Sequence, residues 1–72
     1  MDRRFLEEDL AIAEMDVTTG GVRLLVQRRL VSDLGRIGHD TTESEKFLAR
    51  LEALQVMHTE HRDRVRLELG GT

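Results

Sequence analysis

The residues of this chain that could do chemistry are gathered in one stretch, MHTEHRDRV, at residues 57–65. Its two histidines, His58 and His61, are three residues apart and have Glu60 between them. Side chains three apart are neighbours on a helix, so the imidazoles could share a divalent ion or act as a proton switch. A zinc site needs three or four ligands, however, and Glu60 points about 100° away from His61, while His39 lies in a separate linker. The sequence therefore predicts no metal site and no cofactor.

The rest of the chain contains no residues arranged as in a known catalytic motif. There is no cysteine, no glycine-rich phosphate loop follows a strand pattern, and Ser44 is remote from the histidines. A chain of 72 residues forms one small domain, which has too little core to enclose a substrate. We therefore predict that residues 1–72 form a single domain that is not an enzyme.

The composition favours an all-α protein. Proline is absent, charged residues make up 35% of the chain, and most apolar residues are Leu, Val or Ala. No apolar run approaches the roughly 20 residues of a membrane span, and the N-terminus lacks the long apolar segment of a secretory signal. We expect a helical protein that is neither in a membrane nor exported by a signal peptide.

Two helices are predicted in the first half of the chain. Apolar residues spaced by four and three indicate a first helix over about residues 2–15. The sequence DVTTGG, residues 16–21, should break it, because adjacent glycines disfavour helix and Asp or Thr can cap a new one. The second helix should span about residues 20–34, with Gly35, or later Gly38, as its C-terminal glycine.

The third predicted helix is the longest and covers about residues 42–66. TESE, Thr42 to Glu45, fits a capping box at its start. The end is ambiguous, since residues 64–69, RVRLEL, alternate as in a half-buried strand, while Val65 and Leu69 also fit the helical row. Helix is the favoured interpretation, and a strand added to a partner's sheet is the alternative.

Length predicts that this helix overhangs its own three-helix unit. At 1.5 Å per residue it would be about 37 Å long, against about 22 Å for each earlier helix and a compact diameter of about 29 Å. The overhang still carries apolar residues, so we expect it to bind another chain, with the histidines packed neutral in that seam. The predicted partner-binding residues are Phe47, Leu51, Leu54, His58, His61, Val65 and Leu69.

Charge is unevenly distributed along a chain of net charge −3. Residues 1–16 hold six acids and two bases, whereas residues 17–36 hold one acid and four bases, so the two segments could pair within one chain or between neighbours. Nucleic-acid binding is less favoured, because the net charge is negative and no Trp or Tyr is present for stacking. The residues that could contact phosphates or an acidic partner are Arg23, Arg28, Arg29 and Arg36.

The stretch DLAIAEMDVTTGGVRLLVQRRL, residues 9–30, resembles the opening of a family of small helical proteins of tailed bacteriophages. In that family an Asp-Leu helix leads through a Thr, Gly and Arg turn into an amphipathic helix with paired leucines. The resemblance implies a virion or head-to-tail accessory component, present in several symmetric copies and bound to larger structural proteins, located in the virion or host cytoplasm. The matching residues are Asp9, Leu10, Thr18, Gly21, Arg23 and Leu25.

These observations together predict a non-enzymatic structural or assembly protein. It would dock its long third helix on a larger partner or on its own copies. The alternative is a small helical regulator that binds nucleic acid or another protein.

Overall fold

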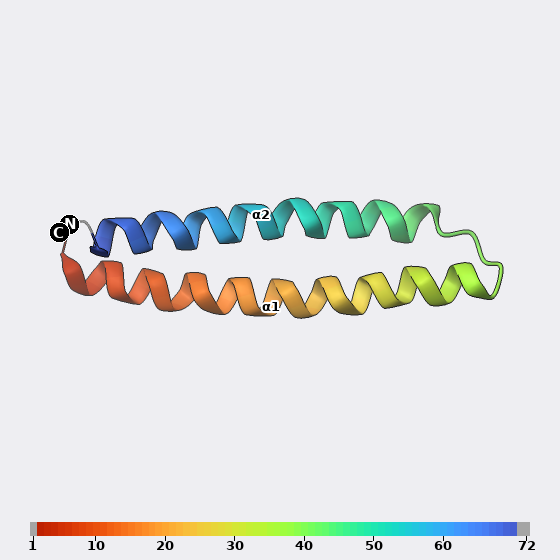
Figure 1. Ribbon diagram of the computed structural model, residues 1–72, viewed down its shortest axis with the longest axis horizontal. Helices are drawn as coiled ribbons and strands as arrows, with labels where there is room; N and C mark the ends of the chain where they lie inside the picture. The colour runs from red at the N-terminus through yellow and green to blue at the C-terminus, as the bar shows by residue number, and fades with distance from the viewer. Residues whose placement is uncertain (1, 71–72) are drawn as a thin grey trace.

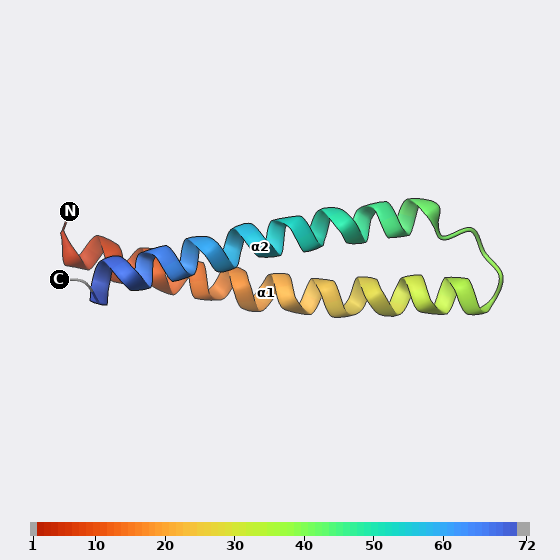
Figure 2. The same cartoon turned by 45° about the horizontal axis from the view of Figure 1, so that its top comes forward.

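The computed structural model describes residues 2–70 and shows a hairpin of two antiparallel α-helices (Figures 1 and 2). Helix α1 spans Arg3–Arg36 and helix α2 spans Thr42–Gly70. They lie side by side as a rod of 54 × 14 × 13 Å, with the start of α1 next to the end of α2. No helix in the described part of the chain is long and apolar enough to cross a membrane.

The expected all-α class is confirmed, but the expected three-helix unit is wrong. The first two predicted helices are one helix, because α1 continues through residues 16–21. Thr18 does not open a new helix; its hydroxyl donates to the carbonyl oxygen of Glu14 within α1. The reason is that the row facing α2 keeps its alternating spacing of four and three across the glycines. This row is Leu6, Leu10, Ala13, Val17, Gly20, Leu24, Gln27, Val31 and Leu34.

Helix α2 presents a matching row to α1. The predicted start at Thr42 is confirmed, whereas the helix runs on to Gly70, so residues 64–69 are helical and the strand alternative is wrong. The expectation that the last helix overhangs its neighbours is also wrong, because α1, with 34 residues, lies alongside the whole length of α2, with 29 residues. The facing row of α2 is Ser44, Leu48, Leu51, Gln55, His58, Arg62, Val65 and Leu69.

The turn between the helices is set by Gly38, the later of the two glycines considered. Its φ is 80°, the left-handed conformation that glycine adopts without steric cost. The N–H of His39 donates to the carbonyl of Leu34 at 2.9 Å, and that of Gly38 donates to the carbonyl of Gly35 at 3.2 Å. This pair of hydrogen bonds is the Schellman motif, which ends α1 and reverses the chain.

The start of α2 differs from the expected capping box. Thr42 is the first helical residue, and its hydroxyl donates to the Asp40 carboxylate at 2.7 Å instead of accepting a backbone N–H. The backbone N–H of Thr42 donates to the same oxygen at 3.0 Å. The hydroxyl bond first, and the backbone bond second, hold the pKa of Asp40 below its ordinary value, because both stabilise the carboxylate.

The core between the helices is thin and partly polar. Only four apolar side chains in the described residues are buried: Leu6, Ala13, Leu24 and Val65. Gln27 is buried among them and donates to the carbonyl of Ser44 at 2.9 Å. Polar side chains in such a seam fix the alignment of the two helices but contribute less stability than apolar ones.

Candidate interaction surface

Large apolar side chains that the hairpin leaves exposed gather along one side of the rod. On α1, Phe5 and Ile12 are seven residues apart, and Val26 follows fourteen residues later, with Thr19 at the position between them. On α2, Phe47 and Leu54 are likewise seven apart. We call this surface the apolar face; its residues are Phe5, Ile12, Val22, Val26, Leu30, Phe47, Leu54 and Met57.

Contacts between the helices show that the two rows lie on the same side. His61, one interval of seven after Leu54, meets Asp9 at 3.1 Å. Farther along the rod, Phe47 and Val26 line one groove, together with Val22, Arg23, Gln27 and Leu51. The exposed apolar side chains of the two helices therefore lie on the same side of the hairpin, and charged side chains such as Arg23 lie among them.

The opposite side of the hairpin is polar, and we call it the polar face. Arg66 of α2 binds Glu14 of α1 there, at 3.2 Å. A shallow hollow on the same side is lined by Leu24, Arg28, Glu52, Gln55, Val56 and Thr59. Exposed apolar side chains away from the apolar face, such as Leu25, Val56 and Leu67, are scattered among charged neighbours. The hairpin thus exposes most of its large apolar side chains on one side.

The predicted partner-binding residues divide between two surfaces. Phe47, Leu54 and His61 lie on the apolar face and are exposed. The other four face α1 and pack inside the hairpin: Leu51, His58, Val65 and Leu69. Sequence reasoning missed the α1 part of the apolar face, although the spacing of Phe5, Ile12 and Val26 by multiples of seven was visible in the sequence.

The two histidines do not converge on one site. His58 is half-buried in the seam between the helices, whereas His61 is exposed and contacts Asp9. Within residues 2–70, no group of three or more His, Asp or Glu side chains is arranged to hold a metal ion. The histidines of the MHTEHRDRV stretch therefore lie at the contact between the two helices, His58 within it and His61 beside it.

The arginines singled out in the sequence are spread around α1. Arg23 lines the groove on the apolar face, whereas Arg28 lines the hollow on the polar face. Arg29 and Arg36 both pair with Asp33, the former at 3.8 Å. The four side chains do not form the single basic surface that phosphate binding would use.

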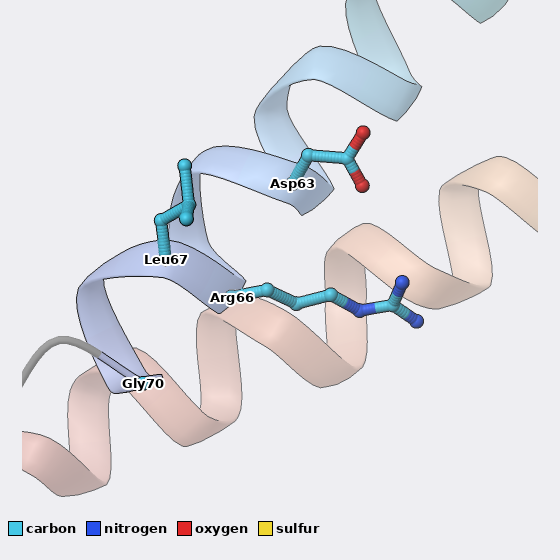
Figure 3. Close-up of a pocket in the computed structure, with 4 residues that line it drawn as sticks. All are labelled: Asp63, Arg66, Leu67 and Gly70. Atoms are coloured by element: carbon cyan, nitrogen blue, oxygen red, sulfur yellow. The ribbon is translucent and has the colours of Figure 1, made fainter.

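A further hollow lies at the end of the rod, over the last turns of α2 (Figure 3). Asp63, Arg66, Leu67 and Gly70 line it. In the close-up Leu67 points away from α1, while Arg66 extends along it toward its partner Glu14. All four residues come from one helix, and they do not combine a nucleophile with a general base, so the hollow has no evident catalytic chemistry.

Comparisons with protein-family models, curated proteins and solved structures found no match to this chain. The turn that the bacteriophage resemblance implies near Thr18 to Arg23 is absent, since these residues lie inside α1. Function must therefore be argued from the two faces of the hairpin.

Proposed function

We propose that this chain is a non-enzymatic assembly protein, a helical rod that works by docking its apolar face on another protein surface. The observation that carries the proposal is the one-sided exposure of large apolar side chains. Soluble proteins rarely leave a contiguous apolar surface in water, and such a surface usually marks a contact site. The thin core adds support, because a two-helix unit with few buried apolar side chains gains stability when a partner covers it.

The setting of this assembly is a separate part of the proposal. The resemblance of residues 9–30 to small phage proteins suggests a virion, where the rod would join larger structural proteins. That setting depends on the resemblance alone, whereas docking through the apolar face is supported by exposure and charge.

Site-specific photo-crosslinking in the cells that produce the protein tests the proposal. A photoreactive amino acid at Leu54 lies on the apolar face, and the same group at Glu52 lies two residues away on the polar face. We expect protein crosslinks from position 54 and few from position 52. Equal crosslinking at the two positions, or none at position 54, would contradict docking through the apolar face.

A further inference from the structure

We propose that the partner covering the apolar face is a second copy of this chain. The two hairpins stack face to face and antiparallel, so that α1 lies on α1, α2 lies on α2, and the turns are at opposite ends of a four-helix bundle. This inference rests on the proposed docking function and names its partner.

The size of the face suits such a dimer. The side of the rod has an outline of 54 × 14 Å, about 750 Å² in projection, which is large enough to hold the roughly 800 Å² of accessible surface that each partner buries in a standard protein interface. A second hairpin has an identical exposed apolar face. Stacking the two hairpins buries both faces against each other, in the two-layer arrangement that helical domains commonly adopt.

Charges on α1 are self-complementary in the antiparallel arrangement. Asp16 and Arg23 follow Asp9 at intervals of seven, so all three lie in one row of α1 beside the seam, on the side of the hairpin that carries the apolar face. Neither Asp16 nor Arg23 has an ion-pair partner within residues 2–70. Their midpoint falls between residues 19 and 20, which is also the midpoint of Arg3–Arg36. Full overlap of the two α1 helices therefore places each Asp16 against Arg23 of the second copy.

The parallel arrangement, with both turns at one end, would place α1 on α2 of the second copy at the same level, so Asp16 and Arg23 of the two copies would not meet. Over whole segments, antiparallel stacking sets residues 1–16, with six acids and two bases, against residues 17–36, with one acid and four bases. Such charge patterns select orientation more than they add affinity.

Sedimentation equilibrium and light scattering on the purified full chain are the first test. We expect a mass of twice 8.3 kDa and a melting temperature that rises with protein concentration. Arg23→Asp or Asp16→Arg alone should weaken the dimer roughly 10- to 100-fold, because like charges then meet twice. The double variant Asp16→Arg with Arg23→Asp should restore it, and Arg28→Asp on the polar face should leave it unchanged. Circular dichroism confirms that each variant is helical.

The orientation has its own measurement. The chain has no cysteine, so His39→Cys places a single spin label in the turn of each hairpin. Antiparallel stacking predicts a label separation near the 54 Å length of the rod, whereas parallel stacking predicts less than roughly 20 Å.

Two outcomes would overturn the proposed antiparallel dimer. In the first, the chain stays monomeric at a concentration of about 100 µM. In the second, the chain forms a dimer whose two spin labels are close together, and the double variant Asp16→Arg with Arg23→Asp does not restore dimer formation. If the chain is monomeric while position 54 still crosslinks to a different protein, the docking function stands and only the identity of its partner is wrong. A monomer without crosslinks at position 54 contradicts both proposals.

Discussion

At the scale of single residues, the closest fit in the hairpin is between Gly20 of α1 and Gln55 of α2. The Gln55 amide donates to the carbonyl of Val17 at 2.8 Å, and its Oε1 is buried against Gly20. A Cβ on Gly20 would overlap that oxygen, whereas one on Gly21 would touch the amide nitrogen only at an ordinary 3.8 Å. Gly20 therefore has a packing role that its neighbour lacks, although both lower helix propensity.

We predict different consequences for alanine at these two glycines. Gly21→Ala should stabilise the protein by about 1 kcal/mol, the usual difference between alanine and glycine inside a helix. Gly20→Ala has the same propensity gain, but it must displace the Gln55 amide from Val17, so it should be clearly less stable than Gly21→Ala. Chemical denaturation of both variants gives the comparison. Equal stabilisation by the two alanines would show that the Gln55 contact contributes nothing.

At the scale of elements, sequence reasoning found the helical class, the start of α2 and the adjacent apolar rows, but not the number of helices. Propensity predicted a break at Gly20, while the spacing of four and three from Leu6 to Leu34 continued through it, and packing prevailed. On α2 the predicted row and the observed row share Leu51, His58, Val65 and Leu69. The observed row contains the polar residues Gln55 and Arg62, so the spacing of apolar side chains alone did not indicate it.

The turn offers a prediction at this scale, because its two glycines have different conformations. Gly38→Ala should cost about 1–2 kcal/mol, the penalty for an L-residue in the left-handed region. Gly35→Ala lies inside α1 and meets only Thr41 at 3.8 Å, so it should be neutral or stabilising by up to about 1 kcal/mol. Thermal melting of the two variants tests the assignment. A larger loss from Gly35→Ala would place the end of α1 earlier, as the sequence first suggested.

At the scale of the whole molecule, the two faces of the hairpin explain why α2 carries two overlapping rows. The row containing Gln55 and Arg62 contacts α1, and the row containing Phe47 and Leu54 is exposed. A helix with apolar residues over a wide arc is expected to touch two partners. Only one of them is present within the hairpin.

The last prediction uses two pairs of side chains that are similarly exposed in the hairpin but lie on different faces. Val26 and Met57, each 64% exposed, belong to the apolar face, while Leu25 and Val56, 67% and 55% exposed, lie outside it. In an isolated hairpin, replacing either pair with serine should cost about the same. If a partner covers the apolar face, Val26→Ser with Met57→Ser should lower the unfolding free energy by about 3 kcal/mol per chain. The control pair, Leu25→Ser with Val56→Ser, should lower it by less than about 1 kcal/mol. Denaturant unfolding at several protein concentrations measures both, and equal losses would mean that the apolar face is uncovered in the purified protein.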